Sequence, residues 1–191
     1  TTFAHQNKQS LALFYIDLDN FKWINDSYGH SVGDKLLVEI SERINSLLRP
    51  DDQLFRIGGD EFTIIAKNSQ SIESLAKFAN AIIESAAQDF YISDITLHTG
   101  VSIGIAVYPQ DAENPQTLVK QADIAMFQAK LQGRGQLCFF SQDFENKRIH
   151  DQNIANDLKA ALANNELSLY LQPKIDIQSD SFDVHSAEAL I

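Results

Sequence analysis

The segment Arg56–Ile65, RIGGDEFTII, places two glycines and two acids between short apolar runs. Paired glycines supply the positive φ angles that a tight turn needs, so the flanking segments QLFRI and FTIIA are predicted to form a β-hairpin. A neutral Asn-Gly pair would close such a turn equally well. The acids Asp60 and Glu61 at the tip therefore raise the question of a chemical role.

Outward from the hairpin, hydrophobic periodicity predicts alternating strands and helices. The predicted strands cover residues 10–19, 95–107 and 136–140, and the predicted helices cover residues 30–48, 71–87 and 115–133. Pro50 ends the first helix, and Gly133 follows the third. This order favours an α+β fold, ferredoxin-like, with a mostly antiparallel central sheet and helices on one side.

The composition of the chain limits the classes of molecule that it can bind. The 191 residues include 15 basic and 26 acidic ones, giving a formal net charge of -11. This charge argues against nucleic acid polymers and direct membrane contact, so an anionic ligand would need metal cations to bind. A single cysteine excludes an internal disulfide framework, and no run of about 18 apolar residues is present. We expect a cytoplasmic protein, although its parent can be membrane-anchored.

Two acidic clusters carry the chemistry. Asp17 and Asp19 end the first strand, and Asp60 and Glu61 occupy the hairpin tip. If the two strands are neighbours in one sheet, these carboxylates form the oxygen-rich site that Mg²⁺ prefers. A pair of such ions can clamp a triphosphate for in-line attack on phosphorus. Taken separately, a Gly-Gly-Asp turn and an Asp-Leu-Asp strand end are usually structural.

Further polar residues suit a nucleotide. In FKWINDSYGHSVGD, Lys22 suits contact with phosphate, and Asn25 and Asp34 suit hydrogen bonds to a base edge. An acid that accepts from the N1 and N2 hydrogens of guanine would favour GTP over ATP. Lys130 and Arg134 lie on one helix face at a spacing suited to phosphate oxygens. Alone, each feature is more often a turn, a helix start or a solvated helix end.

These motifs, in this order, resemble the GGDEF domain of diguanylate cyclases. The likeness is carried by DLDNFKWINDSYGHSVGD (17–34), RIGGDEF (56–62) and ADIAMFQAKLQGRG (122–135), and it extends from about Ser10 to Phe140. Members of this family condense two GTP into cyclic di-GMP and two pyrophosphates, on a fold similar to the palm of adenylyl cyclases and polymerases. The resemblance implies a nucleotidyltransferase of bacterial second-messenger signalling.

The resemblance also implies a role for each matching residue. The metal ligands would be Asp17, Asp60 and the carbonyl of Leu18, holding two Mg²⁺ per active site with Mn²⁺ as an alternative. The substrate-binding residues would be Asn25, His30, Asp34, Lys130 and Arg134. Lys22 would stabilise the developing phosphoryl charge, and Asp60 would assist as proton acceptor for the ribose 3′-hydroxyl. Glu61 would act either beside the second metal or in the hydrogen bonding of the hairpin.

Two regulatory features also follow from the resemblance. Arg49 and Asp52 stand nine and six residues before Gly58, where an R-x-x-D pair resembles the family's product-inhibition site. Without that offset, the pair would be interpreted as a weak surface ion pair. Each domain would hold one GTP, so catalysis would need a homodimer of two facing domains.

The residue composition of the chain changes near residue 145, so we expect a GGDEF domain over residues 1–144 and a second unit over residues 145–191. In the second unit, a polar helix over residues 149–165 precedes a strand, a turn rich in Ser and Asp, and AEALI. This segment resembles the truncated opening of an EAL domain, the cyclic di-GMP phosphodiesterase module. Glu188 would match a metal ligand of that module and Gln172 a substrate contact.

Two functions therefore stay open. The first is an active diguanylate cyclase with product inhibition. The second is a module that binds GTP or cyclic di-GMP without turnover and regulates a neighbouring EAL phosphodiesterase, because family membership alone does not establish activity. The intact acids at the hairpin tip favour the first.

Overall fold

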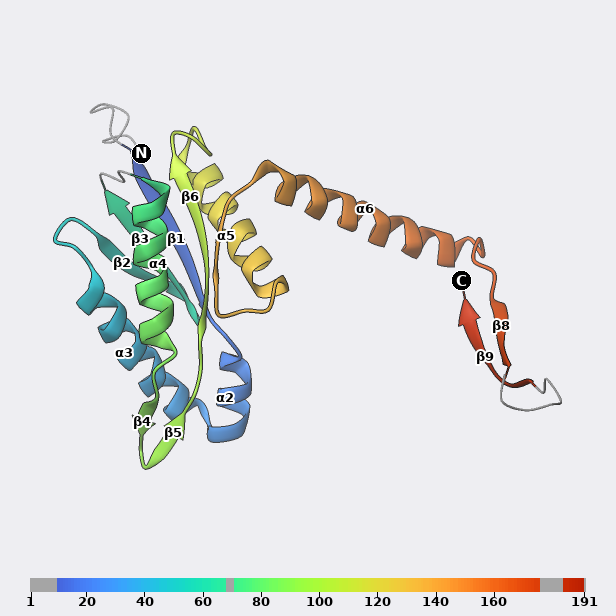
Figure 1. Ribbon diagram of the computed structural model, residues 1–191, viewed down its shortest axis with the longest axis horizontal. Coiled ribbons are helices and arrows are strands. Elements are labelled where there is room, and N and C mark those ends of the chain that lie inside the picture. Colours follow the sequence, from blue (N-terminus) through green and yellow to red (C-terminus); the bar gives the residue numbers. More distant parts are fainter. Residues whose placement is uncertain (1–9, 68–70, 176–183, 191) are drawn as a thin grey trace. The chain divides into compact units, whose positions relative to one another are not determined.

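The computed structural model describes residues 10–67, 71–175 and 184–190. The chain divides into two compact units, residues 1–145 and residues 146–191. In the first unit, the described strands are β1 (Leu11–Leu18), β2 (Gln53–Gly58), β3 (Glu61–Lys67), β4 (Phe90–Ile92), β5 (Ile95–Leu97), β6 (Val101–Tyr108) and β7 (Leu137–Phe139). The described helices that lie wholly within it are α2 (Phe21–Tyr28), α3 (His30–Leu47), α4 (Ile72–Ala86) and α5 (Pro115–Leu131), as drawn in Figure 1.

A five-stranded sheet in the order β2-β3-β1-β6-β7 forms the centre of the first unit. Neighbouring strands are antiparallel except for β6 and β7, which are parallel. The predicted α+β class with a mostly antiparallel sheet is confirmed, and the hairpin predicted around the two glycines is the β2–β3 pair. Because β1 lies between β3 and β6, its C-terminal end is flanked by both strands.

Helices cover both faces of the sheet, so the prediction of helices on one side is wrong. Side chains of β1 alternate between two cores: Phe14 and Ile16 pack with α3 and α4, whereas Leu13 and Tyr15 pack with α5. All eight residues of β1 are buried. A strand buried on both faces has no polar alternation, so its pattern does not reveal on which side each helix lies.

Gly104 allows the close approach of α5 to β6. A Cβ atom at this position would overlap the carbonyl oxygen of Ala122 and the backbone nitrogen of Met126, both in α5. Because these are backbone atoms, a larger residue at this position would force the helix away from the sheet. The close packing brings α5, and with it Lys130, over the central strands.

The sequence patterns missed one helix and joined two strands into one. Helix α2 was not predicted, because its eight residues include only two buried ones, Phe21 and Ile24, too few for a periodic pattern. The single strand predicted over residues 95–107 is divided into β5 and β6, and β5 pairs with β4. The turn between β4 and β5 has φ angles of 49° at Ser93 and 65° at Asp94. Such positive angles at residues other than glycine carry little sequence signal.

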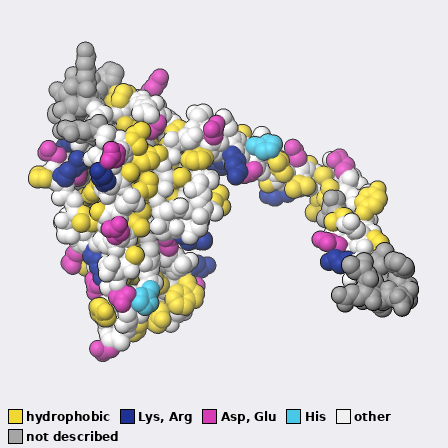
Figure 2. All heavy atoms as spheres, in the orientation of Figure 1, with side chains coloured by type: hydrophobic (Ala, Val, Ile, Leu, Met, Phe, Trp, Pro, Cys, Tyr) yellow, Lys and Arg dark blue, Asp and Glu magenta, His cyan; other side chains and the backbone are white. Residues whose placement is uncertain are grey.

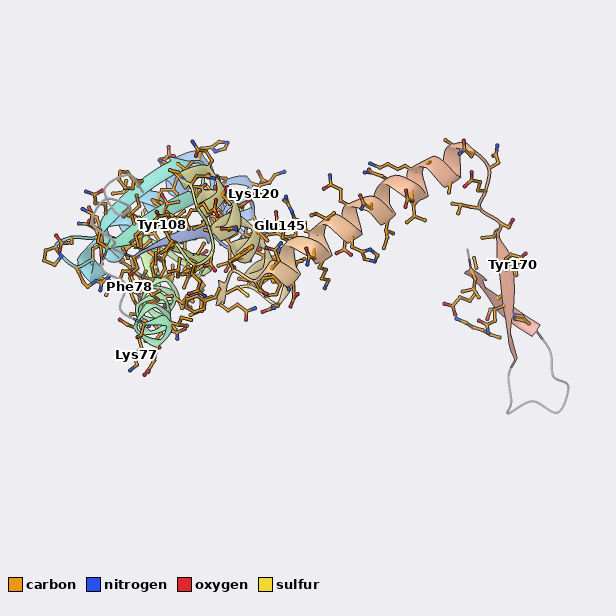
Figure 3. The ribbon with its side chains drawn as sticks, turned by 90° about the horizontal axis from the view of Figure 1, so that it is seen from above. Lys77, Phe78, Tyr108, Lys120, Glu145 and Tyr170 are labelled. Carbon is orange, nitrogen blue, oxygen red and sulfur yellow. The ribbon has the colours of Figure 1, made fainter. Side chains whose placement is uncertain are left out.

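Helix α6 (Gln142–Ala163) begins before the predicted start at Ile149. Glu145 in its first turn forms an ion pair with Lys120 of α5, with 2.6 Å between Glu145 Oε1 and Lys120 Nζ. These two residues are labelled in Figure 3. Both residues belong to the first unit.

The second unit contains the rest of α6 and an antiparallel pair, β8 (Tyr170–Ile175) and β9 (Val184–Leu190). Hydrophobic side chains of α6 are exposed at its surface, as Figure 2 shows; they include Ile149, Ile154, Leu158 and Leu162. The predicted turn rich in Ser and Asp lies outside the described residues. Among the described residues, no helix has the length and apolar character that a membrane span requires.

Candidate functional site

The end of β1 and the tip of the β2–β3 hairpin meet in the structure. Asp17 and Glu61 are cross-strand partners, and the Leu18 N–H donates to the Asp60 carbonyl at 3.2 Å. Asp17 and Asp60, which are 43 positions apart in sequence, are brought to the same end of the sheet because β1 and β3 pair in antiparallel register. This register is what turns two separate acidic segments into one cluster.

Asp17 is the buried member of this cluster, with 6% of its surface exposed. Burial raises the pKa of the Asp17 carboxyl above its ordinary value, Lys130 opposes the rise, and the carboxylates of Asp60 and Glu61 add to it. The Lys130 ammonium Nζ lies 2.6 Å from Asp17 Oδ1. The family resemblance implies that Lys130 binds the triphosphate; in the structure Lys130 is the counter-ion of Asp17.

Glu61 is held by a residue that the sequence analysis did not include. The Tyr15 hydroxyl donates a hydrogen bond to the Glu61 carboxylate, and Tyr15 lies on β1 two residues before Asp17. Burial, together with the charge and hydrogen bond of Glu61, raises the pKa of Tyr15 to about 12. This contact joins Glu61 to β1 and not to β2, the other strand of the hairpin. The sequence pattern does not predict this contact, because a tyrosine in an apolar strand is usually part of the core.

The hairpin tip is braced by Arg56. Its Nε and Nη2 atoms donate to the Gly59 carbonyl at 3.0 and 2.8 Å, across a bulge between Arg56 and Gly58. Gly59 has a φ of 52°, in the region that glycine adopts without strain. Among the described residues, no atom other than those of the chain neighbours lies within 4 Å of a Cβ built on Gly58 or Gly59, so the backbone of the tip is open to a ligand.

The residues predicted to bind guanine lie on α2 and α3, which follow β1 directly (Figure 1). Asn25 packs against Gly33, where a Cβ atom would overlap Asn25 Oδ1. In the described part of the chain, Asn25 Oδ1 is buried without a hydrogen-bond partner. An unpaired buried acceptor costs stability unless a ligand or water satisfies it. His30 and Asp34 are exposed on α3, and Lys22 is exposed on α2.

Asp19 differs from Asp17, with which the sequence analysis grouped it. Its carboxylate is occupied by the protein: Ser102 Oγ donates to Oδ1 at 2.8 Å, and the Gly135 N–H donates to Oδ2 at 3.0 Å. Arg134, the residue before Gly135, is exposed and has a φ of 64°. Asp19 thus joins the end of β1 to the loop that carries Arg134.

Arg49 and Asp52 form a bidentate ion pair. Arg49 Nε and Nη2 donate to the two carboxylate oxygens of Asp52 at 2.8 and 3.1 Å. The Asp52 side chain is 1% exposed and that of Arg49 is 49% exposed. Its hydrogen bond to Asp52 raises the pKa of the Arg49 guanidinium. Because the carboxylate is buried and both of its oxygens are bonded, this is not the weak surface pair that its spacing alone suggests.

In the second unit, Gln172 of β8 and Glu188 of β9 are cross-strand partners. Lys174 Nζ lies 3.6 Å from Glu188 Oε2. The two residues carried over from the EAL resemblance are therefore adjacent.

The residues around Asp17 fit a divalent cation that prefers oxygen ligands. Asp17 and Asp60 offer carboxylates, Leu18 offers a carbonyl, and the like charges of Asp60 and Glu61 make Asp17 harder to ionise. A bound cation would relieve that repulsion, as Lys130 does now. Among the described residues, no three or more His, Cys, Asp or Glu side chains gather as a complete metal centre. The carbonyl and the nucleotide phosphates would have to supply the other ligands.

Comparisons with known proteins identify relatives of both units. A family model described as diguanylate cyclase, GGDEF domain, matches residues 1–136. The chain is 37% identical over 172 residues to the bifunctional diguanylate cyclase/cyclic di-GMP phosphodiesterase MucR of Pseudomonas aeruginosa, covering 90% of this chain and 25% of MucR. It is 37% identical over 187 residues to the cyclic di-GMP phosphodiesterase PdeR of Escherichia coli, covering 98% of this chain and 28% of PdeR.

A solved structure shares the fold. The crystal structure of the GGDEF domain of TpbB (YfiN) from Pseudomonas aeruginosa matches with a TM-score of 0.71 at 40% identity, covering 73% of this chain and 88% of that one. The chain spans about a quarter of the length of MucR and of PdeR.

Proposed function

The chain belongs to the GGDEF family of diguanylate cyclase domains, and on that premise we propose that it condenses two GTP into cyclic di-GMP and two pyrophosphates. The observation that carries the proposal is the meeting of Asp17 with the hairpin tip through the Leu18–Asp60 hydrogen bond. A carboxylate cluster in an acidic chain suits a nucleotide that arrives with metal ions rather than a free anion.

In this proposal, Asp17, Asp60 and the Leu18 carbonyl hold two Mg²⁺, with Mn²⁺ as an alternative. Bound metal supplies charge neutralisation for the phosphates and lowers the pKa of the attacking hydroxyl. Asp60 assists as an acceptor for the proton of the ribose 3′-hydroxyl, and Lys22 faces the charge that develops on the phosphoryl group. Glu61, which already accepts from Tyr15, keeps the tip in register with β1.

The base and the phosphates are held by separate elements. Asn25, with its unpaired buried oxygen, and Asp34 recognise guanine from α2 and α3, and His30 lines the same pocket. Lys130 and Arg134, at the end of α5, hold the triphosphate. Lys130 must then share or exchange its Asp17 partner when nucleotide and metal arrive. Two such domains face each other in a homodimer, because each supplies one GTP.

The direct test incubates the 191-residue chain at high concentration with Mg²⁺ and GTP and measures cyclic di-GMP by chromatography. Asp60→Ala should lower the rate about a hundredfold or more, because it removes a metal ligand. Glu113→Ala, an exposed acid before α5, is the matched control and should retain the wild-type rate. Equal product from wild type and Asp60→Ala would refute the assignment of Asp60.

The alternative is a regulatory module that binds nucleotide without turnover. It is favoured by the match to PdeR, a phosphodiesterase, over 98% of this chain. No product from the wild type at any concentration, together with measurable binding of GTP or cyclic di-GMP, would favour this alternative over the cyclase.

For residues 145–191, we propose the opening segment of an EAL domain. The pairing of Gln172 with Glu188 across β8 and β9 supports it, because a substrate contact and a metal ligand would need to be adjacent.

A further inference from the structure

Asp19 is a buried acid whose hydrogen bonds are made by two separate segments of the first unit, residues 99–102 and Gly135. Its carboxylate accepts from the Ser102 hydroxyl on β6 and from the Gly135 N–H after α5. Its own N–H donates to the Gly100 carbonyl at 2.9 Å, and its carbonyl accepts from the Thr99 hydroxyl at 2.8 Å. Asp19 is 5% exposed, so these contacts replace the water that a free carboxylate would bind.

The segment anchored by Asp19 has an unusual backbone. Gly133, Arg134 and Gly135 have φ angles of 124°, 64° and 59°. A positive φ at arginine costs energy and persists only where surrounding contacts fix it. The Gly133 and Arg134 N–H groups donate back to the Lys130 and Ala129 carbonyls of α5, at 3.3 and 3.2 Å. The next N–H group along the chain, that of Gly135, donates to Asp19, the residue directly after β1.

We propose that Asp19 is a positioning residue for the phosphate-binding side of the active site, because its carboxylate fixes the Arg134 loop to the strand end that carries Asp17. The inference rests on the proposed function. Lys130 contacts Asp17 directly, and Arg134 is held to the same strand end through Gly135 and Asp19. The Lys130 ammonium and the backbone that carries Arg134 are therefore both held near Asp17 before any triphosphate binds, which removes part of the ordering cost of binding.

The hydrogen bonds of Asp19 indicate which substitutions test whether Asp19 positions the Arg134 loop. Asparagine can accept from the Gly135 N–H with its carbonyl and donate to Ser102 Oγ with its amide. Alanine can do neither and leaves two donors without their partner. Ser102→Ala removes one partner of Asp19 while leaving the Gly135 contact intact, so it is a matched control for general loosening.

The test measures affinity of the 191-residue chain, with Mg²⁺, for GMP and for a GTP analogue that has a methylene bridge between the α and β phosphates. Asp19→Ala should weaken binding of the analogue about tenfold, the scale of one charged contact, and change GMP affinity by less than about twofold. Asp19→Asn should restore the wild-type preference. Asp19→Ala should add little in an Arg134→Ala background, because both changes remove the same contact.

Several outcomes would overturn the inference. These are equal losses for analogue and GMP in Asp19→Ala, no rescue by Asp19→Asn, additive effects with Arg134→Ala, or the same preference loss in Ser102→Ala. Where Asp19→Ala does not fold, Asp19→Glu, which keeps the charge and moves the acceptor, takes its place. If the wild type binds the analogue no more tightly than GMP, the inference is overturned even if the wild type makes cyclic di-GMP. A preference that Asp19→Ala abolishes supports the inference even if no product forms.

Discussion

Lys130 and Asp17 form an ion pair in which the ammonium nitrogen lies 2.6 Å from a carboxylate oxygen of Asp17, whose side chain is 9% exposed. The pair joins α5 to the end of β1, and Asp60 and Glu61 lie close enough to oppose the ionisation of Asp17. One half-buried ammonium thus offsets the repulsion within a cluster of carboxylates. The free-energy cost of keeping the Asp17 carboxylate buried and ionised should be measurable in the free energy of unfolding.

Asp17→Asn should change the pH dependence of stability. Burial raises the pKa of Asp17 in the folded state, so the folded protein holds this proton more tightly than the unfolded chain does. As pH rises from the unfolded pKa through the folded pKa, Asp17 therefore subtracts stability from the wild type. Asparagine has no such ionisation. The free energy of unfolding of Asp17→Asn minus that of wild type, measured by urea unfolding without metal, should increase from acidic to neutral pH. A constant or decreasing difference would contradict the assignment.

Tyr15→Phe should lower the free energy of unfolding by about 1 kcal/mol, because Glu61 loses a buried donor. The pKa of Tyr15 is raised to about 12 in the folded state, so the wild type should lose stability as pH rises from the ordinary tyrosine value of 10.0 toward 12. Tyr15→Phe should lack this loss. Urea unfolding across that range measures it, with Tyr91→Phe, an exposed tyrosine, as control. The same alkaline loss in Tyr15→Phe would refute the contact.

Gly33→Ala should weaken GTP binding by roughly tenfold if Asn25 recognises guanine. The added methyl group would overlap Asn25 Oδ1 and approach Phe21, so Asn25 must move. Calorimetric titration with GTP measures the effect, and Ser31→Ala, an exposed change in the first turn of the same helix, is the control. Unchanged affinity in Gly33→Ala would exclude Asn25 from the base pocket.

Arg49→Ala should relieve inhibition by added cyclic di-GMP if Arg49 and Asp52 form the product-inhibition site. It should also cost roughly 2 kcal/mol of stability, because the buried Asp52 carboxylate loses its guanidinium partner. Rates with and without product, each normalised to the uninhibited rate of the same variant, separate the two effects. Lys77→Ala breaks an exposed pair with Glu73 and should change neither quantity. Inhibition that persists in Arg49→Ala would place product binding elsewhere.

Much of the fold could be read from local patterns. The two glycines of the hairpin, the apolar run of β1 and the periodic positions of α3, α4 and α5 each depend on neighbours within a few residues. Helix α2 and the β4–β5 hairpin could not be read, because one is short and the other turns through Ser93 and Asp94 at positive φ. The helical layer on the second face was also hidden, since every side chain of β1 is apolar or buried.

The sequence by itself determined which residue types were available: acids at a strand end and at a turn, cations at a helix end, and an Arg-Asp pair before the hairpin. Only the tertiary structure decided which of them meet. Antiparallel pairing of β1 with β3 joins Asp17 to the tip, while Asp19 turns out to be committed to Ser102 and Gly135. Lys130 contacts Asp17 because Gly104 lets α5 approach the sheet. Strand register and helix packing are set by contacts between residues far apart in the chain, which no local pattern contains.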